Sequence, residues 1–260
     1  MRLLAAIAVA ATILAAPVGL AATVHFHRAR VPTTAEQEHA VGVWLGRGEA
    51  VYCGGPHGNA VALTFDDGPG PYTARLLAEL RAAGAHATFF LVGNRLQYWP
   101  HFARPESRLG AVGNHTWSHP RLVGLPRWLV WLELARTQWQ EQQELGRKPE
   151  LFRVPYELHD ATVDSVARSL GLLQVFWSVD SRDDVPNAKP ARIVRNVLAG
   201  LRPGAIVIMH DIHPWTVRAV PRILRAIHRR GLRAVSVPEL LALDPPSSGR
   251  ACPIPPSAKA

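Results

Sequence analysis

The chain has 260 residues, 48% of them hydrophobic, and this length is enough to bury one sizeable core, which we expect to form a single domain. The formal net charge of +9 favours an anionic polymer or a membrane surface as a neighbour. No basic run with interleaved aromatic residues is present, so nucleic acid is not an expected partner.

The first 24 residues predict an export signal or an N-terminal membrane anchor. Met1-Arg2 precedes an apolar stretch from Leu3 to Val24, and cleavage near Gly19–Ala21 would suit the small-residue rule. A bilayer takes about 20 apolar residues to span, so residues 3–24 are also long enough for an uncleaved anchor. In both cases the protein is exported, and we expect it to be secreted or membrane-anchored with its domain outside the cytoplasm.

The rest of the chain divides into a polar connector at residues 25–59, a folded domain at 60–245 and a proline-rich tail at 246–260. Two cysteines lie near the two ends of the domain, Cys53 before its first strand and Cys252 in the tail. In an oxidising compartment they could form a disulfide, and two free thiols are the alternative.

Strands and helices alternate along the domain, which predicts a mainly parallel α/β sheet, either a barrel or an open doubly wound sheet. The predicted strands are 61–65, 88–93, 151–156, 173–180, 205–210 and 234–237. The predicted helices are 72–83, 125–145, 161–170, 191–201 and 216–230, with a short or broken helix at 100–110 because it contains Pro105.

The longest helix, at 125–145, carries an apolar stripe of Trp128, Leu132, Ala135 and Trp139, spaced three or four residues apart. We expect its tryptophans, including Trp131, to pack in the core or against a membrane rather than to form a sugar platform.

Two adjacent acids end the first strand in the sequence Thr64-Phe65-Asp66-Asp67-Gly68-Pro69. Alone, this pattern is also that of a solvated turn. Downstream, His115 and His119 lie four positions apart, a spacing at which two imidazoles can converge on one ion. Two histidines and one carboxylate form a common zinc ligand set with coordination positions left for water and substrate. The coincidence of both patterns therefore predicts a metal site and its base.

Further polar clusters end the later strands, at Arg153–Tyr156, at Asp180–Asp183 and at Ile208–Asp211. In parallel α/β folds the carboxyl ends of the strands meet at one edge, where the chemistry is placed. Arg153 or His210 alone would fit an ordinary ion pair or core residue, but several clusters on one edge favour an active site.

With these motifs in place, the chain from about Val61 to Leu241 resembles the NodB-type polysaccharide deacetylases, carbohydrate esterase family 4. The resemblance implies a distorted (β/α) barrel, the NodB homology domain, that removes acetyl groups from amino sugars or xylan with a divalent metal, usually Zn²⁺. It also implies residue roles: Asp67, His115 and His119 as metal ligands, Asp66 as general base, the main-chain N–H of Tyr156 as an oxyanion donor, His210 as general acid, Asp183 as its partner and Arg153 as the partner of Asp66.

The chain departs from the family pattern at two residues. Glu157 stands where a small residue usually follows the tyrosine, and Asp184 replaces a tryptophan that usually walls the acetyl pocket. The segment before His115 is also about one residue shorter than in typical relatives.

The expected substrate is an N-acetylated glycan, with peptidoglycan of the cell wall or a chitin-like N-acetylglucosamine polymer first. O-deacetylation of acetylated xylan shares the mechanism and is one alternative. A non-catalytic glycan-binding relative, with its acetyl pocket altered by Glu157 and Asp184, is the other.

Overall fold

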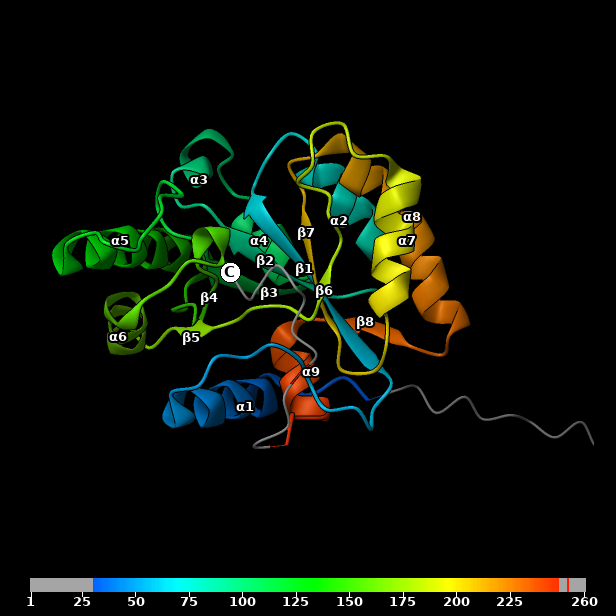
Figure 1. Cartoon of the computed structure of the whole chain (residues 1–260), viewed down its shortest axis with the longest axis horizontal. Coiled ribbons are helices and arrows are strands. Elements are labelled where there is room, and N and C mark those ends of the chain that lie inside the picture. The colour runs from blue at the N-terminus through cyan, green and yellow to red at the C-terminus, as the bar shows by residue number, and fades with distance from the viewer. Residues whose placement is uncertain (1–29, 248–251, 253–260) are drawn as a thin grey trace, which may run out of the picture. The chain divides into compact units, whose positions relative to one another are not determined.

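Parallel strands form the centre of this computed structural model, which describes residues 30–247 and Cys252. The strands are β1 (Ala60–Gly68), β2 (Ala87–Leu91), β3 (Gly110–Asn114), β4 (Leu151–Phe152), β5 (Leu173–Gln174), β6 (Val179–Asp180), β7 (Ile206–His210) and β8 (Arg233–Val235). Their order is β5-β4-β3-β2-β1-β7-β6, with β8 paired to β1, and every strand pairing is parallel (Figure 1). The predicted fold class, a distorted (β/α) barrel, is confirmed by this curled parallel sheet.

The helices are α1 (Thr34–Arg47), α2 (Thr73–Ala82), α3 (Arg95–Tyr98), α4 (Ala103–Ser107), α5 (Arg127–Leu145), α6 (Ala161–Ser169), α7 (Pro190–Gly200), α8 (Pro214–Arg229) and α9 (Val237–Leu243), with a 3₁₀ turn at Pro155–Glu157. Helices α2 to α8 lie between strands of the parallel sheet, whereas α1 precedes β1 and α9 follows β8. The five longer predicted helices agree with α2, α5, α6, α7 and α8 to within two residues at each end. The segment with Pro105 forms only the short helix α4, as its proline predicted.

Strand β1 lies in the middle of the sheet and packs on both sides. Val61, Leu63 and Phe65 join one buried cluster, whereas Ala60 and Ala62 join the other. This alternation follows from the two-residue period of a strand. Because both faces are covered, the strand is an almost continuous apolar run until it reaches its polar carboxyl end.

Helix α1 lies within the stretch that the sequence predicted to be a connector. It begins at a capping box made by Thr33 and Glu36 and ends at Gly48, which has a φ of 68°. Val41 and Trp44 bury its inner face, and the helix packs beside α9, as Figure 1 shows in blue and orange-red. The described part of this stretch therefore belongs to the packed structure. The predictions for residues 1–24 and for most of the tail lie outside the described residues.

Helix α5 corrects the prediction for its tryptophans. Trp128, Trp131 and Trp139 are 66%, 49% and 59% exposed, so the expectation that they pack in the core is wrong. The buried face carries Val130 and Leu134 together with three polar residues, of which Gln138 donates to the carbonyls of Pro149 and Leu170. Hydrophobic spacing therefore indicated the wrong face.

Among the described helices, none is both long and apolar enough to cross a bilayer.

Two predicted strands are shorter than expected. Only Leu151–Phe152 of the segment 151–156 is a strand, because the chain then enters the 3₁₀ turn. The segment 173–180 divides into β5 and β6, which lie at opposite ends of the strand order.

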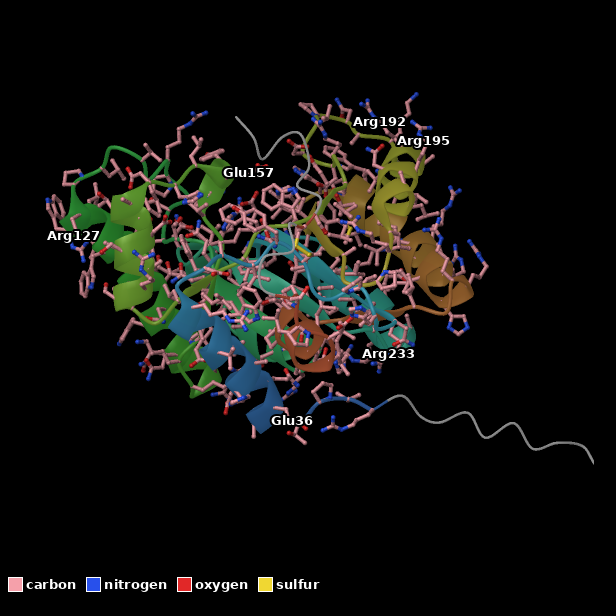
Figure 2. The ribbon with its side chains drawn as sticks, turned by 60° about the horizontal axis from the view of Figure 1, so that its bottom comes forward. Glu36, Arg127, Glu157, Arg192, Arg195 and Arg233 are labelled. Carbon is pink, nitrogen blue, oxygen red and sulfur yellow. A yellow bond between two sulfur atoms is a disulfide. The ribbon has the colours of Figure 1, made fainter. Side chains whose placement is uncertain are left out.

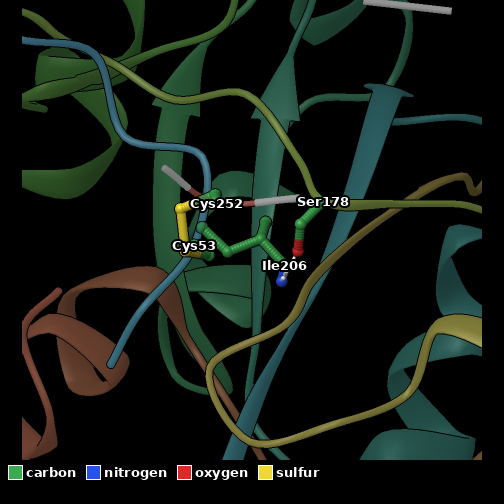
Figure 3. Close-up of a disulfide and its surroundings, with 4 residues drawn as sticks. All are labelled: Cys53, Ser178, Ile206 and Cys252. Atoms are coloured by element: carbon green, nitrogen blue, oxygen red, sulfur yellow. Dashed lines mark hydrogen bonds between the residues drawn. A yellow bond between two sulfur atoms is a disulfide. The ribbon is translucent and has the colours of Figure 1, made fainter. Parts of the chain in front are cut away.

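A disulfide joins Cys53 to Cys252, which are 199 residues apart, so this alternative of the sequence prediction is the one the structure contains. Figure 3 shows it near Ile206, whose main-chain N–H donates to the Ser178 hydroxyl at 3.2 Å. Cys53 also forms an antiparallel bridge with Ala205, next to the start of β7. A cross-link over so long a stretch restricts the unfolded chain and so stabilises the fold.

Candidate active site

A cavity of about 560 Å³ opens at the carboxyl ends of the strands. Its lining includes six of the eight predicted site residues: Asp66, Asp67, His115, His119, Tyr156 and His210. The other lining residues are Val154, Glu157, Trp177, Asp180, Asp184, Ile208, Ile212 and His213. The two remaining predicted residues, Arg153 and Asp183, are buried behind this lining and bond to residues in it.

The two acids at the end of β1 have different surroundings. Asp66 is 2% exposed, and its Oδ1 accepts a hydrogen bond from the Arg153 guanidinium at 2.8 Å. Asp67 has a φ of 69°, in the left-handed region that aspartate tolerates better than most residues. This backbone turn directs the second carboxylate toward the histidines, where its Oδ1 lies 3.2 Å from Nε2 of His119.

The two histidines lie on a tight loop after β3. Asn114 accepts a hydrogen bond from the Thr116 main-chain N–H at 2.8 Å and donates to the Leu134 carbonyl on α5. Glu133 of α5 accepts the main-chain N–H groups that follow, those of residues 117 and 118, at 2.9 and 2.8 Å. Helix α5 thus holds the loop through the Glu133 carboxylate and the Leu134 carbonyl.

Three ligand atoms converge next to this loop. Nε2 of His115 lies 3.5 Å from Oδ1 of Asp67, and the candidate ligand atoms of Asp67, His115 and His119 all lie within 4.8 Å of one another. On the other side of each ring, Nδ1 of His115 donates to the Arg153 carbonyl at 2.7 Å, and Nδ1 of His119 lies 3.1 Å from the Tyr156 hydroxyl. The carbonyl can only accept, so a neutral His115 keeps its proton on Nδ1 and leaves Nε2 for a metal, whereas the Tyr156 hydroxyl can serve His119 as acceptor in the same way or as donor.

The charges around Asp67 favour its ionised form. Burial by itself would raise the pKa of this carboxyl, but the neighbouring imidazoles of His115, His210 and His119 hold it below the usual value. A ligand set of one carboxylate and two neutral imidazoles fits a divalent metal, and zinc in particular. The described residues thus contain the donors that the expected metal needs.

Arg153 is completely buried and uses its guanidinium to hold Asp66. Its NH1 group bonds to the Thr64 hydroxyl as well as to Asp66, and Nε and NH2 bond to the carbonyls of Val175 and Phe176. A buried carboxylate is stable only when such a partner compensates its charge. Arg153 therefore keeps Asp66 fixed beside the candidate metal ligands, with Oδ2 of Asp66 4.0 Å from Nε2 of His115.

His210, at the end of β7, is held by Asp183. Its Nδ1 lies 2.7 Å from Oδ1 of Asp183, and its main-chain N–H donates to Oδ2 at 2.8 Å. Thr216 and Trp215 on α8 also bond to Asp183, through its side chain and its carbonyl. Burial by itself would lower the pKa of His210, but the charge and hydrogen bond of Asp183 raise it to about 10. The imidazole is therefore protonated at neutral pH, as a general acid must be.

Tyr156 and Glu157 follow β4 with φ values of 59° and 63°. This strained pair turns the chain over the cavity, so that both side chains line it. Directly after His210, the completely buried Asp211 accepts a hydrogen bond from the Thr73 hydroxyl of α2, and burial raises the pKa of Asp211 to about 7.

Sequence reasoning missed the residues that support this site from elsewhere in the chain. Glu133, Thr73 and Thr216 have no local motif, because each acts through a partner far away in the sequence. Asn114 had a signal, since it directly precedes His115 at the end of a strand.

This arrangement is typical of metal-dependent hydrolases: a two-histidine, one-aspartate ligand set, a second carboxylate held apart from it, and an imidazole backed by an acid. The model of the polysaccharide deacetylase family matches residues 54–175. The peptidoglycan-N-acetylglucosamine deacetylase PgdA of Listeria monocytogenes is 35% identical over 182 residues, 69% of this chain and 38% of that protein. The chain thus spans less than half the length of this relative.

Two further relatives are matched over most of their own length. A chitooligosaccharide deacetylase of Bradyrhizobium is 35% identical over 200 residues, 70% of this chain and 90% of that protein. The solved structure of the peptidoglycan deacetylase PdaC of Bacillus subtilis has a TM-score of 0.66 and 32% identity, over 71% of this chain and 91% of that one. The chain therefore belongs to the polysaccharide deacetylase family, carbohydrate esterase family 4, as the motifs predicted.

Proposed function

We propose that this protein is a zinc-dependent deacetylase that removes acetyl groups from an N-acetylated glycan outside the cytoplasm. One observation carries the proposal: a single cavity gathers the three candidate metal ligands, the Asp66–Arg153 pair and the His210–Asp183 pair. Relatives named for peptidoglycan and chitooligosaccharides support a β-linked N-acetylglucosamine glycan as the substrate. Such glycans lie outside the cytoplasm, which agrees with the export signal or anchor expected at residues 3–24.

The proposed mechanism divides the work among the residues of the cavity. Asp67, His115 and His119 hold the metal. Zinc bound there would lower the pKa of a water molecule and would polarise the acetyl carbonyl. Asp66 lies beside these ligands and is fixed by Arg153, so it accepts the proton that the attacking water loses.

The remaining steps use the opposite side of the cavity. As attack converts the amide carbon to a tetrahedral centre, the main-chain N–H of Tyr156 donates to the oxygen that gains negative charge. His210 begins as an imidazolium because of Asp183, and it donates its proton to the departing amine as the carbon–nitrogen bond breaks. The products are acetate and a glucosamine unit, and the proton taken by Asp66 returns to solvent or to His210.

Acetate release tests the proposal directly. The purified protein is treated with a chelator, dialysed and assayed on peptidoglycan, chitooligosaccharides and acetylated xylan, with and without added Zn²⁺. We expect acetate from at least one N-acetylated glycan, only when metal is restored. Acetate from xylan alone would favour the ester alternative. Glycan binding without acetate from any substrate would favour the non-catalytic one and overturn the proposal.

A further inference from the structure

One side of the cavity carries acidic side chains that the proposed mechanism does not use. Glu157, Asp180 and Asp184 line it together with the candidate metal ligands. Figure 2 labels Glu157 on the 3₁₀ turn after β4. Two of these acids, Glu157 and Asp184, are the residues at which the chain departs from the usual family motifs. The acidic side is therefore a feature of this chain rather than of the shared machinery.

These acids are only partly balanced by cations. Arg182 lies 3.2 Å from Oδ2 of Asp180 and donates its main-chain N–H to Oδ1. In the described part of the chain neither Glu157 nor Asp184 forms a salt bridge, and the buried Oε2 of Glu157 has no hydrogen-bond partner there. The nearby Arg153 is already bonded to Asp66 and to main-chain carbonyls. Within the described residues, Glu157 and Asp184 thus line the cavity without a direct ionic partner.

The pKa of Glu157 agrees with this geometry. Burial, together with the charges of Asp180 and Asp184, raises it to about 7 against the opposing charges of Arg153 and Arg182. The carboxyl consequently gains negative charge over the range from about pH 6 to pH 8.

A second observation indicates what this side of the cavity can accept. The indole N–H of Trp177 has no hydrogen-bond partner among the described residues, although the side chain is only 5% exposed and lines the same cavity. The N–H itself is enclosed by the protein, so Trp177 adds a neutral side chain to the cavity that Glu157 and Asp184 line, and no cation that could offset their charge.

We propose that Glu157, assisted by Asp184, is a specificity-determining residue that makes the cavity select neutral N-acetylhexosamines and disfavour sugars that carry a carboxylate. This inference rests on the proposed deacetylase function. The excluded class includes N-acetylmuramic acid with a free lactyl carboxylate, which differs from N-acetylglucosamine by that acidic ether group. Like charges brought together in a partly enclosed cavity repel strongly enough to change substrate preference about tenfold.

The test compares two substrates of equal length, tetra-N-acetylchitotetraose and a peptide-free tetrasaccharide of alternating N-acetylglucosamine and N-acetylmuramic acid. Acetate release with Zn²⁺ restored gives kcat/KM for each. We expect the wild-type protein to prefer the neutral substrate by about tenfold at pH 8. Glu157→Gln should reduce this ratio several-fold, and Glu157→Gln with Asp184→Asn should reduce it further. Glu157→Asp, which keeps the charge and suits a positive φ, should preserve the ratio.

The matched control is a variant that removes an acidic side chain outside the cavity. Glu79 pairs loosely with Arg75 on α2 and does not line the cavity, so Glu79→Gln should leave the ratio unchanged. The pH dependence adds a second readout: the wild-type preference for the neutral substrate should grow from pH 6 to pH 8, and this growth should be lost in Glu157→Gln. Using a ratio cancels effects of pH on steps common to both substrates.

The outcomes separate this inference from the proposed function. A ratio that Glu157→Gln and the double variant leave at the wild-type value, or a wild-type preference for the acidic tetrasaccharide, would overturn the inference while acetate release still supports the function. Failure to release acetate from both substrates and from the wider glycan panel would instead overturn the proposed function.

Discussion

Asp66 and Asp183 can be compared with Glu106 and Glu141, since all four carboxylic acids are almost completely buried. The two aspartates support the cavity. Asp66 accepts from Arg153, and Asp183 accepts three hydrogen bonds, two from His210 and one from the Thr216 hydroxyl. Burial by itself would raise the pKa of Asp183, but the charge of His210 and these bonds hold it below its usual value.

The two glutamates lie on the neighbouring helices α4 and α5, and within the described residues neither carboxyl has a hydrogen-bond partner. Burial raises their pKa values well above the usual one, and nearby acids add to the effect. Burial thus favours the neutral, protonated form of both glutamates. Beside the cavity, by contrast, partners compensate the charge of the two buried aspartates.

The strongest test of this comparison is Asp66→Asn, which keeps the shape of the side chain and removes its charge and basicity. We expect acetate release to fall by roughly 10²–10⁴-fold, the usual contribution of a general base. Bound zinc, measured after dialysis, should remain, because Asp66 is not one of the three candidate ligands. The matched variant Asp67→Ala should lose both zinc and activity. Loss of zinc in Asp66→Asn would contradict the division of roles between the two acids.

Arg153→Met should produce the largest change in stability. It leaves Asp66 buried without its cation, which costs about 3–5 kcal/mol in unfolding free energy. Chemical denaturation measures the loss. Combining Arg153→Met with Asp66→Asn removes both charges and should recover a substantial part of it. If the double variant were no more stable than Arg153→Met alone, the cost would arise from lost packing rather than from the uncompensated charge.

Asp183→Asn tests the second buried aspartate, and its effect is measured as a change in the pH dependence of kcat. Because Asp183 raises the pKa of His210, the imidazole of the wild-type protein keeps its proton well above pH 7 and loses it only as the pH rises further. Without that charge, burial lowers the pKa of His210, so the alkaline decline in kcat should move to lower pH. We expect a loss of about 10²-fold at pH 8, smaller at pH 6. A parallel loss at all pH values would contradict a role in proton donation.

The sequence predicted those parts of the site that carry their chemistry locally. Asp66, Asp67, His115 and His119 lie in short motifs at strand ends, and a parallel sheet brings such ends together. Residues that act through long-range contacts could not be predicted in this way. Glu133 reaches the histidine loop from α5, and its bonds depend on how that helix packs.

The same physical reason explains the errors in the fold. Hydrophobic periodicity placed Trp128 and Trp139 on the inner face of α5, but that face is partly polar, since Gln138 donates to the Pro149 carbonyl there. Helix α1 was predictable in part, because Thr33 and Glu36 form a capping-box pattern and Gly48 is a typical helix end. Its low amphipathicity hid it, and its packing against α9, a contact distant in the sequence, helps to stabilise it.

The smallest expected effect is that of Glu106→Gln on the pH dependence of stability. This variant tests the two buried glutamates that lack a hydrogen-bond partner within the described residues. The folded-state pKa of Glu106 lies above its ordinary value of 4.5, so its contribution to stability is complete below about pH 4.5 and is lost as the pH rises through the folded-state pKa. The wild-type unfolding free energy should therefore fall between pH 5 and pH 8, and Glu106→Gln should make that fall shallower by on the order of 1 kcal/mol.

Denaturant titrations at several pH values measure this slope, and the exposed Glu79→Gln serves as the control that should leave it unchanged. Glu141→Gln should act in the same direction, because burial is the main cause of both raised pKa values. An unchanged slope in both variants would mean that these glutamates are ionised in the folded protein. Buried negative charge would then be tolerated away from the cavity, and the contrast with Asp66 and Asp183 would not hold.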